Sequence, residues 1–220
     1  MTMNTLETTQ RFLGLIRFSH TLFALPFALT AGVLVWGLHG FSWIQLLGIV
    51  VCLGLARAAA MAFNRLVDRD IDAANPRTAS RHLPAGLLGT KAVVLFFVIT
   101  STGFVAGTAL FLLEGNSVPL IMSIPTLAWI CGYSYAKRFT AMAHFWLGAA
   151  LMLAPAASWV VALGWGVLEE PWIPLLLGLS VFFWVSGFDM IYATQDIEYD
   201  HSVGLRSVPA YRGLRGALVA

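Results

Sequence analysis

Charged side chains are scarce in this chain. Asp, Glu, Lys and Arg together make up only 11% of its 220 residues, whereas hydrophobic residues make up 59%. A soluble domain carries about 25% charged residues, and a water-facing surface cannot be covered with less than half of that. The scarcity excludes an ordinary soluble domain and, with a mean hydropathy of +0.80, indicates a polytopic membrane protein.

Cysteine is also nearly absent, and neither residue indicates a redox or metal function. Cys52 and Cys131 lie in apolar runs far apart in the sequence, so we interpret them as small buried hydrophobic residues. The net charge of +2 is too small to indicate a nucleic acid partner. The first ten residues contain neither Lys nor Arg, unlike a secretory signal peptide, so the first apolar run is expected to remain as a membrane span.

Long apolar runs dominate the rest of the chain. A helix needs about 20 such residues to cross the hydrocarbon core. Six runs reach this length, at roughly 15–38, 42–63, 91–113, 117–136, 142–165 and 172–193. After Asp200 only the last few residues are apolar again, which predicts a loop and the first turns of a seventh helix. The predicted fold is therefore all-α, a transmembrane helical bundle of six spans plus the start of a seventh.

Lys and Arg are missing from every second loop. All thirteen fall near the N-terminus, late in the second run, or in the segments that follow the second, fourth and sixth runs. The other loops carry acids alone: Glu114, Glu169 and Glu170. Because positive residues collect on the cytoplasmic side of a membrane, this alternation predicts that the charged face is cytoplasmic.

Against this background, the segment "MAFNRLVDRDIDAANPRTASRHLPAG" at 61–86 concentrates charge. Asn64, Asp68 and Asp72 are spaced four apart, so on a helix they lie along one face. A second group with helical spacing surrounds the end of the sixth run: Asp189, Asp196 and Asp200. If the second and sixth spans face each other, the two groups of carboxylates meet at the cytoplasmic rim.

These clusters suit a magnesium diphosphate. Carboxylates beside a membrane are costly unless they are paired or bind cations, and Mg²⁺ is often held by one or two carboxylates plus substrate phosphates. Nearby arginines would contact the remaining phosphate oxygens in bidentate fashion. A solvated loop is the simpler explanation for Asp70, and a topology signal is the simpler one for Arg57 and Arg69. Neither accounts for two acidic groups at helical spacing.

The same residues carry a resemblance to a known family. "NRLVDRDID" fits the N-x-x-x-D-x-x-x-D motif of the UbiA-type intramembrane prenyltransferases, and "DMIYATQDIEYD" resembles their second, D-x-x-x-D-containing motif. The likeness covers nearly the whole chain, from "LIRFSHTLFALPFAL" to "GLRSVPAYRG". It is closer to the group that prenylates hydroxybenzoate or naphthoate acids than to the haem-farnesylating branch.

The resemblance implies Mg²⁺-dependent transfer of a prenyl chain from a polyprenyl diphosphate to an aromatic acid, 4-hydroxybenzoate or a dihydroxynaphthoate, in quinone biosynthesis at a bacterial inner or plasma membrane. By position, Asn64, Asp68 and Asp72 would hold one Mg²⁺, and Asp196 and Asp200 the other. These four aspartates are the expected catalytic residues. The expected substrate-binding residues are Arg17, Asn64, Arg77, Arg81, Lys137, Arg138, His144, Asp189 and Tyr192.

The resemblance also implies nine helices, so residues 1–220 are expected to form a single prenyltransferase domain that stops before helices 7 to 9. Whether a chain of this length is active without helices 7 to 9 is therefore open. An allylic cation requires a dry, aromatic-lined cavity, and Tyr133, Tyr192 and Tyr199 are the aromatic residues nearest the charged rim. His20 and His144 could orient the acceptor or form interhelical hydrogen bonds.

Two other functions remain open at this point. A cation transporter could use the acids as a cytoplasmic vestibule, although ion pathways need polar groups near the middle of the membrane. An inactive, shortened family member is the other alternative. Activity of the isolated chain would distinguish it from a transferase.

Overall fold

The structure is a computed structural model that describes residues 5–16 and 24–219. Over these residues the chain is helical, which confirms the predicted all-α class. The α-helices are α1 (Thr5–Leu15), α3 (Leu25–His39), α4 (Trp43–Val67), α5 (Arg69–Ala74), α6 (Thr90–Thr108), α7 (Val118–Phe139), α8 (Ala143–Leu163), α9 (Trp172–Ala193), α10 (Ile197–Ser202) and α11 (Val208–Val219). Short 3-10 helices extend three of them: η1 (Ala109–Glu114), η2 (Gly164–Leu168) and η3 (Thr194–Asp196).

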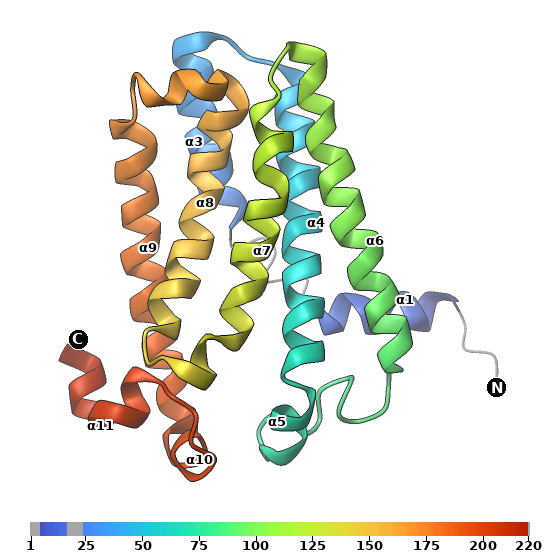
Figure 1. Cartoon of the computed structure of the whole chain (residues 1–220), viewed down its shortest axis with the longest axis vertical. Coiled ribbons are helices and arrows are strands. Elements are labelled where there is room, and N and C mark those ends of the chain that lie inside the picture. Colours follow the sequence, from blue (N-terminus) through green and yellow to red (C-terminus); the bar gives the residue numbers. More distant parts are fainter. Residues whose placement is uncertain (1–4, 17–23, 220) are drawn as a thin grey trace.

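The long helices form an upright bundle (Figure 1). Within the described residues, five are long and apolar enough to cross a membrane: Trp43–Val67, Thr90–Glu114, Val118–Phe139, Ala143–Leu168 and Trp172–Ser202. The apolar helix α3 is shorter, at 15 residues, or about 22 Å of helix rise. This confirms a transmembrane bundle and matches five of the six expected spans closely.

The first expected span, 15–38, is wrong at its start. Leu15 belongs to α1, and the apolar helix begins only at Leu25, where Pro26 occupies the first turn. Proline is favoured there because its missing N–H has no partner in the first turn of a helix. In Figure 1, α1 lies across the lower end of the bundle rather than along it. Its Phe12 ring stacks on Phe96 with centroids 4.9 Å apart, and Leu15 is buried.

The segment expected to start a seventh helix is not one continuous helix in the structure. It corresponds to α11, whose helical backbone is broken at Gly213 with a φ of 69°. A left-handed conformation of this kind costs glycine little, but it ends the i to i−4 hydrogen bonding of the preceding turns. The segment is tied to the bundle upstream, because the Arg206 N–H donates to the carbonyl of Lys137 at 2.7 Å.

Helix α8 packs against α9, α3 and α7 and so lies at the centre of the bundle. Its contact with α9 is close at Gly148, where an added Cβ would lie 2.6 Å from the Phe182 carbonyl oxygen and nearer still to the Ser186 hydroxyl. Small residues let membrane helices approach in this way. The α8–α9 contact matters for function because His144 and Asp189 lie on these two helices.

We expect Gly148→Ala to lower the free energy of unfolding by about 1–3 kcal/mol, because overpacking a tight contact displaces backbone. Thermal unfolding in lipid would measure it. Gly54→Ala is the matched control, since a Cβ there meets no atom within 4 Å, and it should unfold at the wild-type temperature or above. Equal unfolding temperatures for both variants would contradict the close α8–α9 contact.

Candidate active site

Asn64, Asp68 and Asp72 keep a common helical face across a break in the chain. Helix α4 ends at Val67 and α5 begins at Arg69, with Asp68 between them at φ −91° and ψ 7°. The backbone ladder nevertheless continues: the Asp68 N–H donates to Asn64 at 2.9 Å, and the Asp72 N–H donates to Asp68 at 2.7 Å. The predicted stacking of these residues therefore holds in the structure.

Asp68 is buried and enclosed by positive charge. Only 2% of the residue is exposed. Lys137 Nζ lies 3.1 Å from one carboxylate oxygen, and Arg138 Nη2 donates to the other at 3.2 Å. Asn64 Nδ2 donates a third contact at 3.1 Å. Both bases come from the last turn of α7, so Asp68 links the C-terminal ends of α4 and α7.

Asp72 has one oxygen that is satisfied and one that is not. Arg81 Nη1 donates to Oδ1 at 2.6 Å, while Arg65 Nη1 lies 3.6 Å from Oδ2. Asp72 is only 3% exposed, and its Oδ2 has no hydrogen-bond partner among the described residues. A buried carboxylate oxygen without a donor is costly, so this atom is a candidate ligand position.

A short turn after α5 orients Arg77. The Asn75 side-chain oxygen accepts from the Arg77 N–H at 2.9 Å, and Thr78 Oγ1 donates to the Asp72 carbonyl at 2.9 Å. The guanidinium then donates to both oxygens of Asp196, with Nε at 2.8 Å and Nη2 on the second oxygen. This hydrogen bonding raises the pKa of Arg77 above its usual range, with the Asp196 charge acting in the same direction.

The second acidic group lies at the same end of the bundle as the first. Figure 1 shows α5 and α10 together at the lower end, and the Tyr199 hydroxyl donates to the Ile71 carbonyl at 2.8 Å. Arg77 Nη1 also donates to the Tyr192 hydroxyl at 3.1 Å. Asp200 accepts from Ser207 Oγ at 3.1 Å. The two sequence motifs are thus bridged by Arg77 and Tyr199 rather than by direct carboxylate contacts.

A buried His144 on α8 pairs with a partly exposed Asp189 on α9. His144 Nδ1 lies 2.8 Å from Asp189 Oδ2, and the histidine is 4% exposed. An ionised carboxylate only accepts, so in this arrangement Nδ1 donates, and in a neutral ring Nε2 is then an acceptor. Nε2 is buried and has no hydrogen-bond partner among the described residues.

Arg57 is a further candidate site residue. From the sequence it was interpreted as a signal for membrane topology. It precedes the end of α4 at Val67 by ten residues, about 15 Å of helix rise into the membrane. Its Nε is buried without a hydrogen-bond partner among the described residues, and Tyr133 lies within electrostatic range of it. Its position inside an apolar run could have indicated a functional role, since charges within membrane spans are rare and usually functional.

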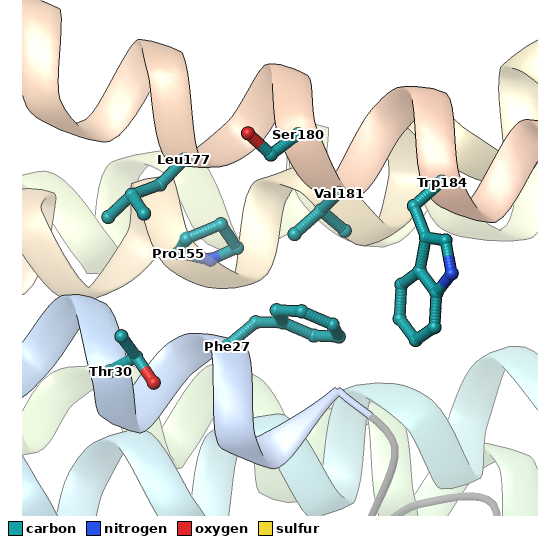
Figure 2. Close-up of a pocket in the computed structure, with 7 residues that line it drawn as sticks. All are labelled: Phe27, Thr30, Pro155, Leu177, Ser180, Val181 and Trp184. Carbon is teal, nitrogen blue, oxygen red and sulfur yellow. The ribbon is translucent and has the colours of Figure 1, made fainter.

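A groove of about 390 Å³ opens between α3, α8 and α9 (Figure 2). It is lined by Phe27, Thr30, Pro155, Leu177, Ser180, Val181 and Trp184. The rings of Phe27 and Trp184 meet edge to face with centroids 5.4 Å apart. Trp184 precedes Asp189 by five residues on α9, about 7.5 Å of rise, so this apolar, aromatic groove starts beside the charged end.

The oxygen atoms at this end of the bundle suit Mg²⁺ as ligands, but they do not surround it completely. The ligands on offer are carboxylate and amide oxygens, which Mg²⁺ prefers, and Asp72 Oδ2 has no donor of its own. Across the described part of the chain, no three His, Cys, Asp or Glu side chains converge as a metal cage. Since Mg²⁺ usually takes one or two carboxylates and completes its shell with water and substrate phosphates, these residues fit an ion that a bound phosphate shares.

Most of the expected site residues therefore lie at one end of the bundle. Those brought together by the contacts above are Asn64, Asp68, Asp72, Arg77, Arg81, Lys137, Arg138, Tyr192 and Asp196. Asp200 and the His144–Asp189 pair flank them through separate contacts. Arg17 and His20 lie outside the described residues.

The structure is a bundle of membrane-spanning helices with paired acidic and basic side chains at one end, an arrangement typical of an intramembrane enzyme. Comparison with known proteins identifies its family. The chain belongs to the UbiA prenyltransferase family, whose model matches residues 24–220. It is 33% identical over 176 residues to a 4-hydroxybenzoate octaprenyltransferase of Yersinia enterocolitica, covering 78% of this chain and 57% of the relative. A Vibrio campbellii protein of the same name is 29% identical over 179 residues, with 81% and 60% covered. The chain spans about 60% of the length of these relatives.

Solved structures agree with this assignment. The apo structure of a UbiA homologue from Aeropyrum pernix K1 has a TM-score of 0.84 and 34% identity, covering 91% of this chain and 72% of that one. A UbiA homologue from Archaeoglobus fulgidus, bound to GPP and Mg²⁺, has a TM-score of 0.73 over 95% of this chain and 71% of its own. At 21% identity, that second likeness shows the fold alone.

Proposed function

We propose that this chain performs Mg²⁺-dependent transfer of a prenyl group from a prenyl diphosphate to an aromatic acid within a membrane. The observation that carries the proposal is Asp72 Oδ2, a buried ligand oxygen without a donor beside Arg65 and Arg81. The names of the relatives support 4-hydroxybenzoate as the acceptor, and a dihydroxynaphthoate is the alternative. The charged end would face the cytoplasm of a bacterium, because Lys and Arg collect there.

The basic residues would hold the diphosphate while its bond to the prenyl carbon breaks. Bound Mg²⁺ would supply charge neutralisation for the departing diphosphate. Four basic residues each contact a carboxylate at the site: Arg77, Arg81, Lys137 and Arg138. A bound diphosphate would take the place of these carboxylates as their partner. Their fixed positive charge stabilises the diphosphate more strongly as it accepts the electron pair of the breaking C–O bond.

The apolar groove would hold the prenyl chain and exclude water from it. An allylic cation reacts with water, so a dry surface is needed at the reacting carbon. The rings of Phe27 and Trp184 meet in this groove (Figure 2), and aromatic rings there could stabilise positive charge. Product chain length would follow from how much prenyl chain this groove accommodates.

His144 would accept the proton that the aromatic ring loses. When the new C–C bond forms, one ring C–H proton must leave, and it would pass to His144 Nε2, which has no hydrogen-bond partner among the described residues. Asp189 would hold the opposite ring nitrogen in its protonated form and stabilise the imidazolium that results. These roles assign His144 as the base and Asp189 as its positioning residue.

Arg57 would bind the carboxylate of the acceptor. Its guanidinium lies deeper in the membrane than the diphosphate end, and a half-buried cation whose buried Nε has no partner among the described residues favours an anionic ligand. We expect Arg57→Ala to raise the KM for the aromatic acid by about 10–100-fold, the range for losing a charge-assisted hydrogen bond, with the KM for the prenyl diphosphate unchanged. Steady-state kinetics with each substrate varied would measure both values, and a rise confined to the diphosphate KM would contradict this role.

The proposed function is tested with the purified chain in lipid, supplied with geranyl diphosphate, Mg²⁺ and either acceptor. We expect prenylated acid that disappears with EDTA and in Asp68→Ala. Asp70→Ala is the matched control, because its side chain is 90% exposed and, among the described residues, pairs with neighbouring Arg69 alone, so activity should persist. Absence of product from a folded sample with either acceptor would overturn the proposal for this chain.

A cation transporter is less well supported. Asp68, Asp72 and Asp196 are each paired with Lys or Arg, and such pairing removes the net negative charge that would attract cations into a vestibule.

A further inference from the structure

A second, smaller pocket of about 200 Å³ lies between α1, α4 and the segment that follows α5. Its lining consists of Gly14, Leu15, Arg65, Arg77, Ser80, Arg81 and His82. None of these seven residues is acidic, whereas three carry guanidinium groups. A small space faced by several guanidinium groups, an imidazole and a hydroxyl is suited to a phosphoryl group, which accepts hydrogen bonds from all of them.

The charges around this pocket do not balance. Arg65 and Arg81 share a single carboxylate, Asp72, at 3.6 Å and 2.6 Å. Arg77 is matched by Asp196. Among the described residues, the three arginines are thus paired with two carboxylates, while Arg11 of α1, whose charge reaches His82, is itself paired with Glu7. An anion in the pocket would compensate this excess.

His82 is the one imidazole in the lining of this pocket. Its ring packs against the backbone of α1, because a Cβ built on Gly14 would lie 2.8 Å from Cε1 and 2.9 Å from Nε2. Within the described part of the chain, no hydrogen bond holds either ring nitrogen. Burial, with the charges of Arg11 and Arg65, holds the pKa of His82 below its usual value. The lowered pKa favours the neutral imidazole, which presents one N–H donor.

We propose that this pocket binds the outer phosphate of the prenyl diphosphate and that His82 donates a hydrogen bond to it, with Gly14 providing room for the ring. The inference rests on the proposed function for the identity of the ligand. A phospholipid headgroup offers the same chemistry at a membrane surface. The diphosphate is favoured because Arg65 and Arg81 connect the pocket directly to Asp72, within the site that the substrate must enter.

Binding of inorganic diphosphate with Mg²⁺, measured by calorimetry on the full chain in nanodiscs of neutral lipid, tests this without requiring turnover. We expect His82→Ala to raise the Kd about tenfold, the loss of one hydrogen bond to a charged group, and His82→Gln to retain part of the affinity. Gly14→Ala should also weaken binding because it displaces the ring. Gly37→Ala is its control, since no atom lies within 4 Å of the added Cβ.

The outcomes separate this inference from the proposed function. Unchanged diphosphate affinity in folded His82→Ala and Gly14→Ala would overturn the inference, even if the chain transfers prenyl groups. A dependence on His82 that appears only when anionic lipid is added, and not with diphosphate, would overturn it in favour of a headgroup site. Diphosphate binding that needs His82, in a chain that makes no product, would support the inference while the proposed function fails.

Discussion

Asp72→Asn is expected to lower kcat/KM by about 10³-fold at saturating Mg²⁺, comparable to losing a principal charge-stabilising group. Asparagine has nearly the same size as aspartate, so packing in α5 is kept. The substitution removes the negative charge that Oδ2 offers to a cation, and the charges of Arg65 and Arg81, no longer compensated, then repel the metal ion. Transfer of a geranyl group at several Mg²⁺ concentrations would measure the loss.

The neighbouring Asp70 provides the control for Asp72. Asp70→Asn makes the same chemical change two residues away, on an exposed side chain, and should keep wild-type kinetics. If both variants lose activity equally, the effect comes from the net charge of α5 and not from a ligand position. If Asp72→Asn keeps kcat/KM within threefold of wild type, Asp72 is no metal ligand.

The second large effect is expected at the Arg77–Asp196 bridge. Arg77→Asp should lower kcat/KM by at least about 10²-fold, because it removes a diphosphate-binding cation and repels Asp196. The reciprocal change, Asp196→Arg, should do the same. Both single variants should also unfold at lower temperature, since each leaves like charges at a half-buried contact.

Combining the two changes separates the structural role from the substrate role. The exchanged pair, Arg77→Asp with Asp196→Arg, restores an attraction across the contact and should recover most of the unfolding temperature. Activity should remain at least about 10²-fold down, because the cation and the carboxylate no longer sit where diphosphate and metal need them. Recovery of activity together with stability would mean that the bridge serves the fold alone.

Much of the fold could be predicted because it follows from local properties of the chain. A span needs a certain length of apolar residues whatever its neighbours, and five such helices lie where the apolar runs predicted them. The exception was the first run, where Leu15 ends one helix and Leu25 begins another. The sequence between them includes Arg17, Ser19, His20 and Thr21, polar residues that argued against one continuous apolar span at 15–38.

The candidate site was predicted in part for the same reason. The spacing of Asn64, Asp68 and Asp72 already places them on one helical face, and the backbone ladder preserves it. The role proposed here for Arg57 was not predicted from the sequence, because a charge in an apolar run can equally mark the topology. Only its unpartnered Nε and its neighbour Tyr133 indicate a binding role.

What the sequence determined by itself was the class of the protein, the helices and the faces on which its acids lie, because helix periodicity and membrane thickness act on each segment separately. The tertiary structure alone decided which base meets which acid. Arg138 reaches Asp68 across 70 residues and Arg77 reaches Asp196 across 119. Such pairs depend on how α4, α7 and α9 pack together, and helix packing is a property of the whole bundle that no short stretch of sequence contains.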